Sequence, residues 1–454
     1  MQAILLRAFV VLAVQVGVPL TVPLTVPLTA AAQEPSPAPE PPVVDHSQHQ
    51  QETTSLFSGR DASGTAWLPE ATPMHGFHRS AAGWELMAHG NAFLQYFYES
   101  GEEHRRSQQA GSINWLMGMA RRPAGAGRIG LRAMVSVEPW TIGGCGYPNL
   151  LATGEVCNGD TIHDRQHPHD LFMEVAAEYD RPLMGSLRWQ VYGGLAGEPA
   201  LGPPGFPHRP SAMPNPVAPV GHHWLDATHI TFGVLTAGIY GPRWKVEASA
   251  FNGREPDAER AGLDLAPLDS WSARLSLAPN PRLAFQVSAG RLREAEAAFG
   301  ADPRTDLSRL TASASHHRAL ANSGQWATTL AYGMNAESAI IAEGVLDEVT
   351  HAVLLETSAT TGRGHMWFGR AEAVQKPAHD LHAHEFITEV FTVGKLQAGY
   401  VRYGSPWKGL RPGIGATISA SVVPLLLAPR YGGRVAPGAG MFLTLRPGSA
   451  VASN

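Results

Sequence analysis

The chain has 454 residues, a net charge of -5 and a sequence pI of about 6.5, so its charge balance excludes a strong attraction to nucleic acid. Charged residues make up only 16% of the chain, while it contains 48 glycines and 36 prolines. Beyond the first 32 residues, no stretch reaches the roughly 18 apolar residues that a membrane-spanning helix needs.

The first 32 residues read as a signal peptide, which predicts export. Arg7 precedes an apolar run over residues 8–20, and three Val-Pro-Leu-Thr repeats end at Thr29. Ala30-Ala31-Ala32 then provides the small residues that a signal peptidase recognises. The alternative, a membrane anchor, is disfavoured because the apolar run is short and the prolines of the repeats would break a helix.

Residues 33–83 have a different composition and predict an unstructured periplasmic arm. The segment 34–42 is rich in proline, which favours an extended linker. Imidazole and thioether groups follow, and they suit soft or borderline metal ions such as copper, although a chance composition explains them equally well. These residues are His46, His49, Met74, His75 and His78.

From residue 84 to residue 447, apolar and polar side chains alternate along successive segments. Residues 244–251 are an example, with Trp244 and Val246 on one face and Lys245 and Glu247 on the other. This period of two predicts strands with one apolar face and one polar face. Lipid solvates no free backbone group, so a membrane-spanning sheet must close on itself. We therefore predict an all-β fold, a closed antiparallel transmembrane β-barrel.

The connections between these segments favour a barrel over a soluble β-sandwich. Tight links such as 278–282 and 393–395 alternate with long loops near 142–169, 196–226, 252–269 and 337–349. Short turns at one end and long loops at the other are typical of outer-membrane barrels. We find 17 candidate strands, but bacterial barrels have even numbers, so we expect about 16 strands with long external loops and a short tail at 448–454.

The first long loop combines two cysteines with a histidine-rich segment. Cys145 and Cys157 are the only cysteines, and a disulfide between them would reduce the disorder of the loop. The following segment offers a plausible set of ligands for a divalent metal. The ligands we expect are His163, His167, His169 and Asp170, with Asp164 as a further carboxylate.

The second long loop is dense in proline and therefore stiff, so it could fold inward as a constriction or lid. Its histidines could complete a site with the first loop, because the two loops are neighbours around the wall. These histidines are His222, His223 and His229. The alternative is that residues 164–170 form a hydrogen-bonded plug that folds the first loop into the lumen and binds nothing.

Charged residues recur on the polar face of the strands, and we expect them to point into the lumen. Both signs occur, so pairing across the lumen is the simpler interpretation, and a charge ladder that guides ions is compatible with it. The candidate residues are Arg132, Glu138, Glu174, Glu178, Lys245, Glu247, Arg274, Arg309, Glu356, Arg370 and Glu372.

The segment Asp164-Arg-Gln-His-Pro-His-Asp-Leu-Phe-Met173, with 202–233 and Asn252-Gly-Arg-Glu-Pro256, resembles a family of uncharacterised bacterial outer-membrane barrel proteins. The resemblance covers most of residues 84–447. It implies the fold and the outer membrane, and it implies no substrate or catalytic residue. The His- and Met-bearing arm also resembles, in composition alone, that of copper-resistance outer-membrane proteins.

We expect a pore or a metal-handling barrel, for copper or zinc, with histidine-rich loops at its external mouth. Its partners would be outer-membrane lipid and, during biogenesis, the barrel-assembly machinery. One alternative is a structural barrel whose loops dock a partner without transport. A metal-dependent surface enzyme is a more distant alternative, because no Gly-x-Ser-x-Gly or His-Glu-x-x-His motif occurs. We therefore expect no enzyme.

Overall fold

The computed structural model describes residues 55–102, 104–297, 304–341, 344–386, 388–448 and 450–451. The expected signal peptide, His46 and His49 lie outside these residues. In the described part of the chain, no helix is long and apolar enough to cross a membrane.

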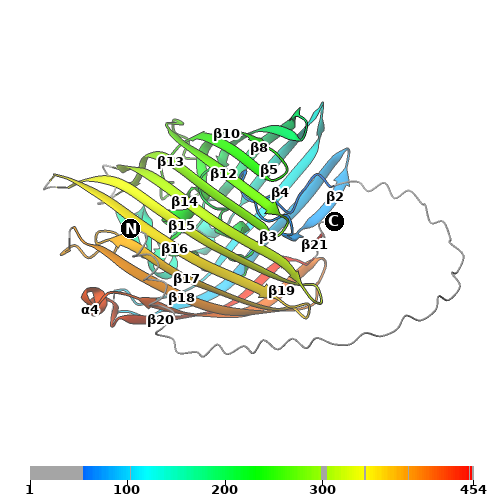
Figure 1. Cartoon of the computed structure of the whole chain (residues 1–454). Helices are drawn as coiled ribbons and strands as arrows, with labels where there is room; N and C mark the ends of the chain where they lie inside the picture. Colours follow the sequence, from blue (N-terminus) through cyan, green and yellow to red (C-terminus); the bar gives the residue numbers. More distant parts are fainter. Residues whose placement is uncertain are drawn as a thin grey trace, which may run out of the picture. The chain divides into compact units, whose positions relative to one another are not determined.

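A closed antiparallel barrel of 16 strands dominates the described residues, as the alternating pattern predicted. The strands follow one another around the wall in chain order, and β20 pairs with β3 to close it (Figure 1). They are β3 (Trp84–Glu99), β4 (Ser107–Ala124), β5 (Gly127–Val135), β8 (Phe172–Met184), β9 (Leu187–Gly197), β10 (Thr231–Tyr240), β11 (Trp244–Phe251), β12 (Ser270–Asn280), β13 (Leu283–Ala297), β14 (Arg304–Leu320), β15 (Gly324–Ile341), β16 (Gly344–Thr360), β17 (His365–Pro377), β18 (Val390–Tyr403), β19 (Leu410–Val422) and β20 (Val435–Pro447).

The barrel carries its apolar side chains on the outside and its polar side chains in the lumen. On β11, Val246 is 51% exposed, whereas Lys245 and Glu247 are each 1% exposed. The strands β12 and β20 show the same strict alternation of exposed and buried residues. This arrangement is the reverse of a soluble sheet, in which the apolar face is covered by the core.

One predicted turn is wrong. The segment 393–395 was expected to be a tight link between two strands, but it lies within β18, where Gly394 pairs with Val422 of β19. A glycine and a lysine inside a strand resemble turn chemistry when the partner strand is unknown. The segments on either side of 393–395 were counted as two candidate strands. They form the single strand β18, which accounts for the difference between 17 candidates and 16 strands.

Short turns lie at one end of the barrel, and long connections lie at the other. The short turns span residues 125–126, 185–186, 241–243, 281–282, 321–323, 361–364 and 404–409. The long connections include residues 136–171, 198–230, 252–269, 378–389 and 423–434. They contain β6 (Tyr147–Cys157), β7 (Asp160–Gln166), α2 (Glu138–Thr141), η1 (Phe206–His208), α3 (His222–Leu225), η2 (Ala227–His229), η3 (Leu425–Leu427) and α4 (Ala428–Tyr431).

Residues 55–83 are ordered, which contradicts the expected unstructured arm for this part of the chain. The strand β2 (Phe77–Ala81) pairs with the start of β3, and β1 (Met74–His75) pairs with β21 (Ala450–Val451). Before β1, residues 55–73 pack against the lumen wall, where Arg132 donates hydrogen bonds to backbone carbonyl oxygens of the arm. Buried wall cations therefore order a segment whose composition alone gave no such signal.

Candidate functional site

The connection 198–230, here called the inward loop, folds into the lumen, and most of its residues are buried. Arg209 anchors it through ion pairs to Glu356 on β16, at 2.7 Å, and to Asp226 within the loop. Ser211 Oγ donates a hydrogen bond of 2.9 Å to the same Glu356. The loop therefore carries His222, His223 and His229 into the lumen, where they are 2%, 4% and 8% exposed.

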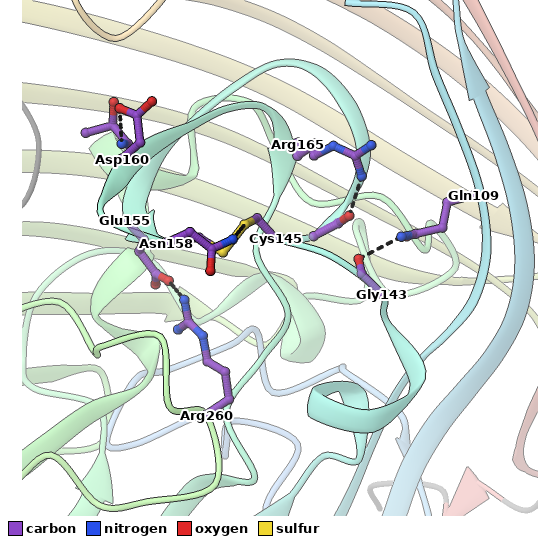
Figure 2. Close-up of a disulfide and its surroundings, with 11 residues drawn as sticks. Gln109, Gly143, Cys145, Glu155, Asn158, Asp160, Arg165 and Arg260 are labelled. Atoms are coloured by element: carbon purple, nitrogen blue, oxygen red, sulfur yellow. Dashed lines mark hydrogen bonds and ion pairs between the residues drawn. A yellow bond between two sulfur atoms is a disulfide. The ribbon is translucent and has the colours of Figure 1, made fainter.

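The connection 136–171, here called the ribbon loop, folds as α2 followed by the β6–β7 ribbon. Cys145 and Cys157 form a disulfide that joins the segment between α2 and β6 to the end of β6 (Figure 2). Arg165 donates a hydrogen bond of 2.8 Å to the carbonyl oxygen of Gly146 and so ties the other end of the ribbon to the same turn. The loop is thereby rigid enough to hold the residues that follow β7 in one place.

The two loops bring five imidazoles together in the lumen, and we call them the histidine cluster: His167, His169, His222, His223 and His229. The ring centroids of His222 and His229 are 5.1 Å apart, and those of His169 and His229 are 5.4 Å apart. His167 lies 6.0 Å from His222 and 5.9 Å from His223. Residues from two loops that were predicted to meet are therefore neighbours.

In three rings of the histidine cluster, the Nδ1 atom takes part in a hydrogen bond and the Nε2 atom points away from that partner. The Nδ1 atoms of His169 and His222 lie 2.8 Å from Glu138 Oε1 and 2.9 Å from Asp226 Oδ1, respectively. His229 Nδ1 lies 2.8 Å from the carbonyl oxygen of Asp226. Histidines that ligate metals through Nε2 commonly have Nδ1 oriented in this way.

The tightest convergence of ligand atoms involves two residues that were not among the predicted ligands. Ligand atoms of His223, Glu255 and Glu296 all lie within 4.8 Å of one another, the single such group of three among the described residues. His223 Nδ1 is 2.7 Å from Glu255 Oε1 and 3.8 Å from Glu296 Oε1. A mixed imidazole and carboxylate set suits zinc or copper(II).

A neighbouring pair extends this group toward the rest of the cluster. His167 Nε2 lies 3.2 Å from Glu155 Oε1, and the backbone NH of Glu155 donates a hydrogen bond of 3.2 Å to Glu255 Oε2. Arg260 pairs with Glu155 and so offsets part of the negative charge (Figure 2). Glu255 lies in the connection 252–269 and Glu296 is near the end of β13, so only the fold relates them to the histidines.

Burial and neighbouring carboxylates set the protonation of the cluster. Burial lowers the pKa of His167 and of His229 well below the ordinary value, so both rings are neutral at pH 7. Burial also acts to lower the pKa of His223, but Glu255 and Glu296 outweigh it and raise the pKa to about 10. An incoming divalent ion would meet neutral imidazoles at His167 and His229 and would displace a proton from His223.

Two predicted ligands are not part of the cluster. The His163 ring stacks on the His382 ring, with centroids 3.8 Å apart, in a half-buried position on the ribbon. Asp170 lies 3.4 Å from Arg260, and burial raises its pKa to about 7. The spacing of the motif could not show this separation, because β7 ends at Gln166 and the chain direction changes after it.

The wall charges point into the lumen and pair there. Glu174 forms an ion pair with Arg132 at 3.3 Å, and Glu247 lies 3.3 Å from Lys245 and 3.2 Å from Arg274. Further pairs join Glu178 to Arg121 at 2.6 Å and Glu356 to Arg370 at 3.3 Å. Glu138 lies on α2, not on the wall as its inclusion among the wall charges implied, and it accepts from His169.

A cavity of about 540 Å³ lies between the arm and the wall, near the short turns. Its lining includes charges of both signs, among them Arg60, Asp61, Arg128, Asp180 and Arg188. Buried residues of the inward loop occupy the lumen elsewhere. Within the described residues, the barrel is therefore partly filled by its own chain.

The chain is similar in fold to solved structures of low sequence identity. No protein-family model and no curated protein matches the chain. Salmonella typhi OmpF in complex with daunomycin is 9% identical and covers 82% of this chain and 100% of its own, with a TM-score of 0.48. The Acinetobacter baumannii outer membrane channel DcaP is 10% identical over 82% of this chain and 100% of its own, with a TM-score of 0.45. The anion-selective porin from Comamonas acidovorans is 10% identical over 80% and 99%, with a TM-score of 0.43.

Proposed function

We propose that the chain is a bacterial outer-membrane β-barrel that handles a divalent transition-metal ion, copper or zinc, at the histidine cluster in its lumen. The observation that carries the proposal is the convergence of five buried imidazoles and the carboxylates of Glu155, Glu255 and Glu296 from separate loops. Buried titratable groups that have perturbed pKa values and specific charge partners are candidates for a functional site.

The membrane location is supported by the surface of the barrel. Apolar side chains such as Leu94, Trp271 and Ile418 are exposed on its outside, at 60%, 57% and 67%. A patch of this kind around a whole wall would drive aggregation in water but is covered by lipid in a membrane. The partners of the folded chain would then be lipid and, before that, the barrel-assembly machinery.

The proposed chemistry is binding and passage, not catalysis. Two of the ring nitrogens are oriented by Glu138 and Asp226, which would keep their Nε2 atoms available as ligands. The ion would be held by groups on stiff loops, and its release would require those loops to move. No nucleophile with a base and an orienting group is needed for this function.

The test is elemental analysis of the purified mature protein in detergent after dialysis against a weak chelator. The parent should retain about one divalent ion per chain, because the cluster would supply the roughly four ligands of one site. The double variant His167→Ala/His169→Ala should lose it. His163→Ala is the matched control, because His163 lies outside the cluster, and it should keep the ion.

The fold of each variant is checked by its heat-modifiable mobility in detergent gels. If the parent and the double variant both contain no metal, or both contain the same amount, the proposal is wrong. In that case the histidines stabilise the inward loop by hydrogen bonding alone.

A further inference from the structure

A second group of potential ligands lies on the lumen wall, away from the carboxylates described above. Methionine and histidine side chains occupy facing positions on three consecutive strands. Met87 of β3 is directly opposite Met119 of β4, and His89 of β3 is opposite Met117 of β4. Met117 is in turn opposite Met134 of β5. Residues directly opposite each other have Cβ atoms about 4.5–5.5 Å apart, so these side chains meet.

These methionines face the lumen and not the lipid. Met87, Met117, Met119 and Met134 are between 0% and 6% exposed. The sequence contains 12 methionines, and seven of them belong to this part of the wall or to the segments against it. Methionine often fills irregular gaps in a protein core. That role alone does not explain why histidine side chains lie among these thioethers.

The inward loop adds an imidazole to this group. His208 Nε2 lies 3.2 Å from the sulfur of Met134. The His208 ring centroid is 5.6 Å from that of His89 and 4.8 Å from that of Trp115. In the described part of the chain, His89 Nε2 is buried without a hydrogen-bond partner. A buried polar atom of this kind costs free energy unless a ligand satisfies it.

A small cavity provides the room for an ion. It measures about 60 Å³, and its lining includes Met87, His89, Met117, Met119 and His208. Two ligand atoms with bonds of about 2.0 and 2.3 Å to one metal at a tetrahedral angle are about 3.5 Å apart. The separation of 3.2 Å between His208 Nε2 and Met134 Sδ is close to this value.

The ligand types define the class of ion. Thioethers are soft, uncharged ligands and favour copper(I) over zinc or other hard divalent ions. Burial and the nearby His89 lower the pKa of His208 well below its ordinary value, so that its ring nitrogen is free of a second proton at pH 7. Asp61 also lines the cavity, but Arg121 pairs with it at 2.5 Å.

We propose that His89, Met117, Met134 and His208 form a second metal site, for a soft monovalent ion such as copper(I) or silver(I). This site is distinct in position and chemistry from the histidine cluster, and it does not depend on the divalent site. It would place a thioether site on the wall beside the inward loop, where an ion passing through the lumen would meet it.

The experiment uses the full chain in detergent, labelled with methyl-¹³C methionine, and silver(I) as a redox-stable probe. Titration should shift the methyl resonances of Met117 and Met134 until one equivalent is bound. Met184 and Met441 are 73% and 68% exposed on the outside and should not shift at that ratio. Single Met→Leu variants assign the resonances.

The variant Met117→Leu/Met134→Leu removes two thioethers and nearly conserves their volume. Its silver(I) affinity should fall by about 100-fold or more, because loss of an outer partner of a ligand alone costs about 10–100-fold. Met441→Leu is the matched control and should bind as the parent does. Met134→Leu alone serves as a second variant if the double variant does not fold.

The two metal proposals are tested by different outcomes, so one can be wrong while the other holds. His167→Ala/His169→Ala should keep the silver(I) shifts at Met117 and Met134 even though it loses the divalent ion. Equal silver(I) affinity in the parent and in Met134→Leu, or shifts confined to the exposed methionines, would overturn the thioether site. The divalent proposal would remain unaffected by that result.

Discussion

Gly154 positions the His223 side chain. Its φ of +112° is unfavourable for other residues, and a Cβ at this position would lie 2.3 Å from the His223 ring. Gly154→Ala should therefore move His223 away from Glu255 without removing any ligand. We expect zinc affinity to fall by about 10–100-fold, as when a partner that orients a ligand is lost. Competition with a colorimetric chelator measures it.

Gly159→Ala provides the matched control. Gly159 also has a positive φ, +84°, but nothing lies within 4 Å of the position of its Cβ. This variant should show similar backbone strain of about 1–2 kcal/mol and unchanged zinc affinity. An equal loss of affinity in both variants would show that strain in the ribbon, and not displacement of His223, is responsible.

The residue types of the site were partly predictable. The clustering of His167 and His169, and of His222, His223 and His229, is visible in the sequence. The carboxylates Glu138, Glu155, Glu255 and Glu296 have no such signal, because each lies alone in its own segment. Their role depends on which segments the barrel brings together.

At the scale of elements, Arg209 decides whether the inward loop stays in the lumen. The residue is 1% exposed and pairs with both Asp226 and Glu356. Arg209→Met should leave two buried carboxylates without a cation and destabilise the protein by about 3–5 kcal/mol. Two measurements report this effect: the temperature at which the mobility in detergent gels changes, and the urea concentration at the midpoint of unfolding.

The control is Arg254→Met, which removes a partly exposed pair with Glu294. Exposed ion pairs contribute only about 0–1 kcal/mol, so this variant should resemble the parent. If Arg209→Met were as stable as Arg254→Met, the inward loop would not depend on its buried ion pairs.

The inward loop should also be sensitive to acid. Burial lowers the pKa of His208 and His229 well below the usual value. An unfolded loop would take up these protons near pH 6.5, so their contribution to stability is present above that pH and is lost below it. Each group changes the free energy of unfolding by up to about 1.4 kcal/mol per pH unit.

The raised pKa values of His169 and His223 change the stability of the loop in a different pH range. Glu138 outweighs burial at His169, and at His223 the carboxylates raise the pKa to about 10, so their contribution is complete below pH 6.5 and is lost on raising the pH. Between pH 6.5 and pH 5 the contribution of His169 and His223 stays complete while that of His208 and His229 is lost, so protease digestion of the loop should be faster at pH 5 than at pH 7. His229→Gln should reduce that difference, and equal rates at both pH values would contradict the prediction.

For the whole molecule, the filled lumen predicts a low conductance. The inward loop and residues 55–73 are largely buried within the barrel. Replacing residues 203–220 by a short Gly-Ser linker should increase single-channel conductance in planar bilayers several-fold, because current through a pore depends on its open cross-section.

The same linker inserted into the exposed turn 404–409 provides the control and should leave the conductance of the parent unchanged. A parent conductance equal to that of the loop deletion would mean that ions bypass the inward loop. The histidine cluster would then lie outside the conducting path.

The alternation of side chains determined the barrel and its long and short connections. A period of two places every second residue on the same face, so an apolar exterior is encoded locally at each strand, as on β11 and β20. The misassigned turn at 393–395 shows the limit of this argument. Local chemistry cannot tell a glycine in a turn from a glycine paired with Val422 in the next strand.

The sequence by itself also determined which residues could bind metal, since imidazoles, thioethers and carboxylates are properties of the residues. Only the tertiary structure decided which of them meet. It joined His223 to Glu255 and Glu296, joined His208 to Met134, and separated His163 from its neighbours in the motif. The physical reason is that a ligand set is a short-range arrangement in space, whereas its members lie on strands and loops far apart in the chain.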